Sequence, residues 1–217
     1  MPTPAQEKVI EKKIREYRKK YLTKQENMEL DETSTRVIVN DLLENILGYK
    51  QLEEIQNEWQ NNGGFADYFI KIGKKSKIII EVKRIGIRLN ENHLRQAHGY
   101  ARDNKTNWVV LTNGRIVELF YVRDTDRSRV FAADLSNLKD IRQSSKYLAY
   151  LTKKSLEKQE IEQYWKRVDA LSDKNLRKAL YSDEIIFGLR RILYRKSKIR
   201  LTTNEITDAL DNLIDRK

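Results

Sequence analysis

The sequence predicts an α/β fold, a mixed β-sheet flanked by helices, followed by an α-helical C-terminal region. Two apolar runs at residues 66–72 and 77–83, separated by the turn-like residues 73–76, predict a β-hairpin. The patterns follow the order helix, strand, strand, helix, strand, strand, which is typical of a mixed sheet with helices packed on it. From about residue 135 the apolar pattern is helical to the end of the sequence.

An amphipathic helix is expected at residues 4–24, where apolar residues recur at helical spacing. These residues are Ile10, Ile14, Tyr17 and Tyr21. Basic residues surround the stripe, so the helix would pack its apolar side on the domain or on a partner. The patterns divide the chain into an N-terminal helix (1–30), a core (31–134) and a helical region (135–217).

A second helix is predicted to begin between Asp31 and Ser34, which are N-cap candidates, and to end at Gly48. Its buried stripe would consist of Val39, Leu42, Leu43, Ile46 and Leu47. Glu32 precedes Val39 by seven positions and lies about 20° from it around the helix, so it should point inward. Glu44 lies about 140° from Val39 and should face solvent. A favourable charge in the first helical turn explains Glu32 equally well.

Three charged residues interrupt the apolar hairpin: Asp67, Glu81 and Lys83. Because side chains alternate along a strand, Glu81 and Lys83 share one face, opposite Ile80 and Val82. Unpaired charge beside a core is costly, and metal binding is one reason for its presence. The alternative is a half-exposed strand whose charged face is in contact with solvent. The hairpin alone leaves both readings open.

Polar residues 49–64 are expected to form a loop that leads into the hairpin. A helix follows the hairpin, from about Asn90 to Asp103. On it, Gln96 and Tyr100 are four residues apart and share a face. The adjoining apolar strip consists of Leu94, Ala97 and Ala101.

Two further strands are predicted at residues 108–112 and 116–122, joined by a hairpin turn at Asn113 and Gly114. A charged loop at 123–129 and a short strand at 130–133 would follow. The remaining apolar patterns mark helices around residues 161–171, 185–193 and 206–213, the last opened by a capping box from Thr202 to Glu205.

The composition limits the chemistry and the partners. The chain has no cysteine, which excludes disulfides, thiolate zinc sites and cysteine nucleophiles. No long apolar run occurs, so no membrane partner and a cytoplasmic location are expected. The net charge is +11, and the basic surplus lies from the hairpin onward. This favours a polyanionic partner, foremost nucleic acid.

Five stretches together resemble the PD-(D/E)xK nuclease superfamily, and more closely the N-terminal nuclease domain of type I restriction enzyme R subunits. They are residues 32–36 leading to 47–49, residues 66–68, residues 81–83, residues 96–100 and residues 111–114. The resemblance covers about residues 31–122. Ala66 stands where the superfamily's name has proline. No GxxxxGK[ST] phosphate loop occurs in these 217 residues, so the helicase motor of R subunits is missing.

The resemblance implies a restriction-endonuclease-like sheet flanked by helices and roles for individual residues. Asp67 and Glu81 would hold Mg²⁺, for which Mn²⁺ can substitute, and the Val82 carbonyl would be a further ligand. Lys83 would orient the attacking water or stabilise developing charge. Glu32 would be the acid on the helix, and Gln96 with Tyr100 would match the glutamine-tyrosine motif near the site.

The expected function is metal-dependent hydrolysis of DNA phosphodiester bonds by an endonuclease of a restriction or defence system. The alternative is a non-catalytic module that keeps the nuclease fold and serves nucleic-acid binding or assembly. RNA as substrate, or an unrelated α/β protein with structural charges, also stays open. A homodimer or larger homo-oligomer is expected, with a partner subunit that supplies a motor or specificity function.

Overall fold

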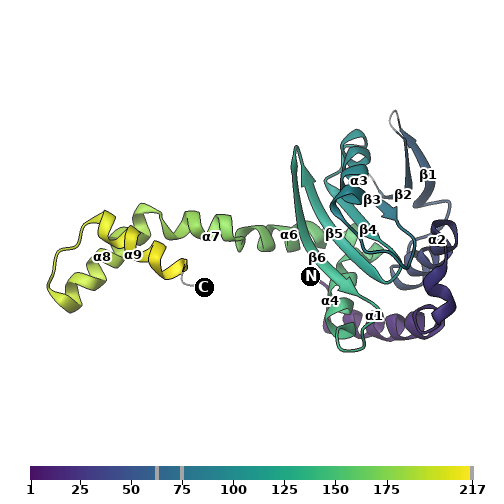
Figure 1. The fold of residues 1–217 in the computed structure, drawn as a ribbon, viewed down its shortest axis with the longest axis horizontal. Coiled ribbons are helices and arrows are strands. Elements are labelled where there is room, and N and C mark those ends of the chain that lie inside the picture. Colours follow the sequence, from purple (N-terminus) through teal and green to yellow (C-terminus); the bar gives the residue numbers. More distant parts are fainter. Residues whose placement is uncertain (62–63, 74–75, 216–217) are drawn as a thin grey trace. The chain divides into compact units, whose positions relative to one another are not determined.

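The computed structural model describes residues 1–61, 64–73 and 76–215 (Figure 1). The chain divides into two compact units, residues 1–165 and residues 166–217. The first contains a six-stranded mixed sheet with helices packed on it, and the described residues of the second form helices and their connections. The predicted α/β class with a helical C-terminal region is therefore confirmed.

The sheet follows the order of the sequence from β1 to β6. Its strands are β1 (Ile55–Asn61), β2 (Gly64–Ile72), β3 (Ser76–Val82), β4 (Trp108–Thr112), β5 (Ile116–Arg123) and β6 (Asp126–Asp134). Neighbouring strands are antiparallel except β3 and β4, which are parallel. These two are joined by helix α3 (Glu91–Asp103), because parallel strands require a crossover connection.

Helices cover both faces of the sheet (Figure 1). On one face, the predicted apolar strip of α3 packs against Ile79, Val109 and Leu111. Helix α2 (Glu32–Asp41) continues into the π-helical segment η3 (Leu42–Ile46), and their buried residues lie on the face of Ile80 and Val110. Asp31 caps α2 by accepting a hydrogen bond from the Ser34 amide at 2.7 Å.

The end of this second helix is also as predicted. Gly48 has a φ of +80°, the left-handed conformation in which glycine commonly follows a helix. The predicted stripe from Val39 to Leu47 is buried.

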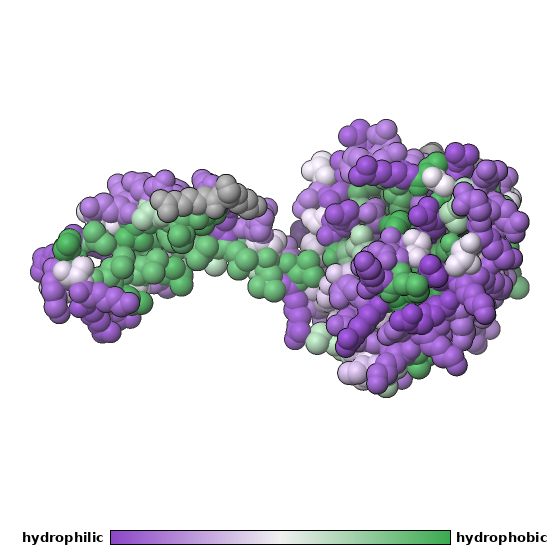
Figure 2. Space-filling model, turned by 60° about the horizontal axis from the view of Figure 1, so that its bottom comes forward, coloured by the Kyte–Doolittle hydropathy of each residue, from purple (hydrophilic) through white to green (hydrophobic). Residues whose placement is uncertain are grey.

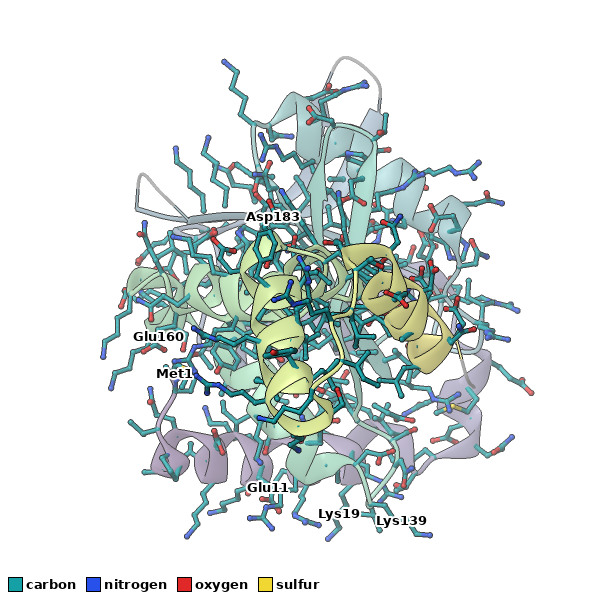
Figure 3. All side chains as sticks on the ribbon, turned by 90° about the vertical axis from the view of Figure 1, so that its left-hand side faces the viewer. Met1, Glu11, Lys19, Lys139, Glu160 and Asp183 are labelled. Carbon is teal, nitrogen blue, oxygen red and sulfur yellow. The ribbon has the colours of Figure 1, made fainter. Side chains whose placement is uncertain are left out.

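The N-terminal helix belongs to the first unit. It comprises α1 (Pro4–Tyr17) and the π-helical segment η1 (Arg18–Leu22), and α1 packs on α4 (Ile141–Leu151). The buried Tyr17 hydroxyl donates to the Gly114 carbonyl at 2.8 Å. The amino group of Met1 donates to Glu160 of α6 (Glu160–Ala170) at 3.0 Å, and Figure 3 shows these two residues close together.

A short helix fixes the loop that follows β3. This 3₁₀ segment, η2 (Gln25–Glu29), brings the Met28 carbonyl against Gly86. A Cβ on Gly86 would lie 2.5 Å from that carbonyl oxygen, so the approach requires glycine.

Two predicted loops are wrong. Residues 55–61 of the predicted loop at 49–64 form β1, whose Ile55 pairs with Ile70 of β2. β1 is an edge strand held by backbone pairing on one side, so it needs no alternation of apolar side chains. Of the predicted charged loop at 123–129, only Asp124 and Thr125 lie outside strands, because β5 ends at Arg123 and β6 begins at Asp126.

The second unit contains α7 (Asp173–Leu180), α8 (Asp183–Ser197) and α9 (Thr203–Ile214), while α5 (Lys153–Glu157) belongs to the first. The predicted capping box from Thr202 to Glu205 opens α9. Large apolar side chains remain exposed in the second unit, and Figure 2 shows them gathered along it. They include Leu171, Leu176, Ile185, Phe187, Ile192 and Ile199. Within the described ranges, no helix has the length and apolar character needed to cross a membrane.

Candidate active site

Five of the seven sequence-predicted site residues meet in one cavity of about 290 Å³, and Val82 and Tyr100 are absent from its described lining. It is lined by Glu32, Arg36, Ala66, Asp67, Glu81, Lys83 and Gln96. All of these except Arg36 and Ala66 are predicted site residues. They come from α2, from the paired strands β2 and β3, from the residue that follows β3, and from α3, so the cavity depends on the packing of both helices on the sheet.

The two hairpin carboxylates lie at the end of the β2–β3 ladder. The register pairs Tyr68 with Ile80, and beyond this pair the Asp67 side chain accepts the Val82 amide hydrogen at 2.7 Å. Asp67 and Glu81 are 8% and 2% exposed. Two carboxylates are therefore held in a largely water-free place, where negative charge is costly without a cation.

Lys83 supplies one such cation. Its Nζ lies 2.6 Å from Glu81 Oε1 and 3.7 Å from Glu32 Oε2. Burial lowers the pKa of Lys83, but the hydrogen bond to Glu81 and the nearby carboxylates outweigh it, so the pKa lies above its ordinary value. Lys83 is therefore a positive charge at neutral pH. Its backbone amide donates to the Thr112 carbonyl at 2.8 Å, which fixes its position beside β4.

Burial dominates the ionisation of both hairpin acids. It raises the pKa of Glu81 to about 7, against the lowering effect of the hydrogen bond from Lys83. Burial also raises the pKa of Asp67, opposed first by the Val82 amide and then by the charge of Arg36. Glu81 therefore exchanges a proton near neutral pH, and a bound cation would favour its charged form.

Arg36 is a site residue that the sequence analysis missed. Its Nε lies 2.9 Å from Asp67 Oδ1, and its Nη2 lies 3.9 Å from Glu32 Oε1. Residues four apart on a helix share a face, so the inward placement of Glu32 already implied that Arg36 faces the same cavity. The angular argument for Glu32 agrees with the structure, whereas Glu44 lies outside the cavity and bonds to Gln51.

Gln96 and Tyr100 take different positions. Gln96 lines the cavity, and its Nε2 donates to the Tyr100 hydroxyl at 3.2 Å. Tyr100 is 8% exposed, belongs to the core between α3 and the sheet, and is absent from the described lining of the cavity. Tyr100 therefore positions the Gln96 side chain from the core between α3 and the sheet. Val82 is fully buried and contacts the site through its amide, and the role of its carbonyl as a ligand stays a prediction.

The donor set suits a hard cation. The described residues contain no group of three or more acidic, histidine or cysteine side chains arranged to hold a metal. However, Mg²⁺ commonly uses only one or two protein carboxylates and fills its shell with water and phosphate. Glu81 Oε2 is buried and has no hydrogen-bond partner among the described residues. Together with the adjacent Asp67 it offers the carboxylate oxygens that Mg²⁺ prefers.

Comparison with known proteins supports the motif-based resemblance. The family model described as "Type I restriction enzyme R protein N terminus (HSDR_N)" matches residues 31–136. No curated protein and no solved structure gives a match. The matched segment contains the whole cavity, from Glu32 to Gln96. This match over residues 31–136 confirms the resemblance predicted from the motifs.

Proposed function

We propose that this protein is a metal-dependent DNA endonuclease that hydrolyses phosphodiester bonds in a restriction or defence system. The family match suggests a restriction-system role and a nuclease. The observation that carries the proposal is the buried Glu81 carboxylate, with one oxygen beside Lys83 and the other without a partner among the described residues.

The proposed metal is Mg²⁺, held by Asp67 and Glu81 with the Val82 carbonyl as a further ligand, and Mn²⁺ can substitute. When bound, such an ion activates water and offsets negative charge on the phosphate under attack. The proposal assigns the remaining tasks to the side chains of the cavity, which are already held by each other and by the sheet.

Lys83 is proposed to stabilise the charge that develops on the phosphate. Its ammonium group lies among carboxylates in a mostly buried place, where a fixed positive charge acts more strongly than in water. Glu32 would orient Lys83 from the helix side at 3.7 Å. Arg36 would hold the Asp67 carboxylate through the contact at 2.9 Å, and Gln96, held by Tyr100, would contact the substrate or its water.

DNA is the proposed substrate because the basic chain favours a polyanion and the matched family acts in restriction. A multi-subunit system, in which a partner supplies the motor or specificity function, is also proposed, and the same match supports it. A homodimer or larger homo-oligomer is also proposed, because double-strand cleavage usually takes two active sites.

Plasmid cleavage with Mg²⁺ or Mn²⁺ tests the proposal. Asp67→Asn keeps an oxygen that can accept the Val82 amide hydrogen, and Lys83→Met removes the ammonium group. Both should lose cleavage while circular dichroism shows an intact fold. Glu44→Gln, which removes a carboxylate outside the cavity, is the matched control and should cleave like the wild type.

Equal cleavage by all four proteins would refute the assigned site. DNA binding by the wild type without cleavage under any divalent ion would favour the non-catalytic module instead. RNA and DNA of the same sequence, compared in the same assay, would decide the substrate.

A further inference from the structure

A second polar cavity, of about 410 Å³, lies where the chain continues beyond β3 and β4. Its walls are residues 86–89, which follow β3, residues 113, 115 and 116 around the β4–β5 turn, and Glu118 and Arg129. Asn113 Nδ2 donates to the Ile87 carbonyl at 2.8 Å and so joins the two loops. The end of β3, which carries Glu81, therefore leads directly into one wall of this cavity.

The lining carries uncompensated positive charge. It contains three arginines and one glutamate, and the Arg129 Nη1 atom lies 3.1 Å from Glu118 Oε1. Arg88 and Arg115 form no ion pair within the part of the chain that the structure describes. Arg115 Nε is buried and lacks a hydrogen-bond partner among these same residues. A buried donor without an acceptor is destabilising, so Arg115 is suited to receive an anionic ligand.

The two cavities lie on the same face of the sheet. Glu81 pairs directly with Leu111, and Leu111 pairs directly with Glu118. Side chains of directly paired residues lie on one face, so these three residues form a row across β3, β4 and β5. Since neighbouring strands are about 4.8 Å apart, the row spans about 10 Å. A nucleic-acid strand advances about 3.4 Å per nucleotide, so one strand reaches both cavities within about three nucleotides.

We propose that Arg88 and Arg115 form a second phosphate site, which binds a backbone phosphodiester of the DNA strand held at the Asp67–Glu81 cavity. Guanidinium groups present a planar fork of donors that matches phosphate oxygens. The inference rests on the proposed function, because the ligand belongs to the same substrate. The site would fix the register of the strand relative to the hydrolysed bond without reading its sequence.

Salt-dependent DNA binding tests the second site separately from cleavage. The affinity of the full chain for a labelled DNA duplex is measured by fluorescence anisotropy in EDTA over a series of KCl concentrations. For Arg88→Gln/Arg115→Gln, the slope of log K against log salt should shrink by about 0.9 for each phosphate that the variant no longer neutralises. Arg88→Lys/Arg115→Lys keeps both charges and should restore most of the slope with weaker binding.

Arg123→Gln is the matched control. Arg123 is an exposed arginine at the far end of β5, and its Nε lies 3.7 Å from Asp124 Oδ2. It lies five residues beyond Glu118, about 17 Å along the strand. Replacing it should leave the slope unchanged. Thermal melts monitor folding, and if the glutamine double variant is unfolded, the single variant Arg88→Gln gives the slope.

The outcomes separate the two proposals. An unchanged slope in the glutamine variant, or no binding of DNA by the wild type, overturns the second site. Inorganic phosphate that competes with DNA at equal phosphate concentration also overturns it, because the ligand would then be free phosphate. A reduced slope in a protein that never cleaves with Mg²⁺ supports the second site and contradicts the proposed cleavage. An unchanged slope in a protein that cleaves DNA with Mg²⁺ contradicts the second site and supports the proposed cleavage.

Discussion

Glu81→Gln is expected to remove a loss of stability that the metal-free protein suffers as the pH rises. Burial raises the pKa of Glu81 to about 7, from an ordinary value of 4.5. The folded chain therefore holds this proton at a pH where the unfolded chain has released it. The stabilising effect is complete below pH 4.5 and is lost as the pH rises through about 7.

The size of the effect follows from the two pKa values. A change from 4.5 to about 7 corresponds to about 3 kcal/mol of unfolding free energy. Glu81 is 2% exposed, so solvent screens this cost only weakly. Asp67, whose pKa burial also raises, contributes in the same direction, and this contribution persists in the variant. The difference between wild type and variant therefore isolates Glu81.

Urea unfolding in EDTA at pH 4.5 and pH 8 measures this difference. Relative to the wild type, Glu81→Gln should gain about 3 kcal/mol between the two pH values. Mg²⁺ at pH 8 should stabilise the wild type and have a smaller effect on the variant. Glu44→Gln is the charge-matched control from outside the cavity. The reasoning is refuted if the stability difference between wild type and Glu81→Gln is the same at both pH values.

Two further predictions concern the loop after β3 and helix α3. Gly86→Ala should lower the unfolding free energy by about 1–3 kcal/mol, because its Cβ would meet the Met28 carbonyl at 2.5 Å. Gly99→Ala is its control, because nothing lies within 4 Å of the added Cβ. Alanine inside α3 should raise the unfolding free energy by about 0.5–1 kcal/mol. Equal changes of unfolding free energy in the two variants, measured by urea unfolding, would contradict the close approach at Gly86. Tyr100→Phe removes the partner of Gln96 and should slow DNA cleavage up to about tenfold at unchanged fold. An unchanged initial rate would show that Gln96 keeps its position without the phenol.

Elements that bury a regular stripe could be predicted from the sequence. The helices from Asp31 to Gly48 and from Asn90 to Asp103 end close to their predicted residues, because their apolar faces repeat with the helical period and their caps are conspicuous. β1 and the first residues of β6 could not be predicted in this way. Their polar sequences become strands through backbone pairing with a neighbour, which leaves no side-chain period to detect.

The candidate site divides along a similar line. Local spacing predicts that Glu81 and Lys83 share one face of their strand and that Glu32 points inward from its helix. These three residues do line one cavity. The contact of Arg36 with Asp67 joins a helix to a strand 31 residues later, and local spacing does not specify such a pair. The packing of α1 on α4 is likewise long-range, so the sequence alone does not indicate that the N-terminal helix belongs to the first unit.

The hydrogen bond from the Val82 amide to Asp67 makes this aspartate part of the sheet as well as part of the site. A side chain without an acceptor oxygen at this position would leave the buried Val82 amide unpaired, so selection for folding alone would retain aspartate or asparagine at position 67. The Lys83 side chain makes no comparable contact with the ladder among the described residues, because its Nζ contacts the Glu81 and Glu32 carboxylates instead. Under the proposed function, a change of Lys83, or of Asp67 to asparagine, in a chain that keeps this fold would therefore indicate that cleavage is no longer under selection.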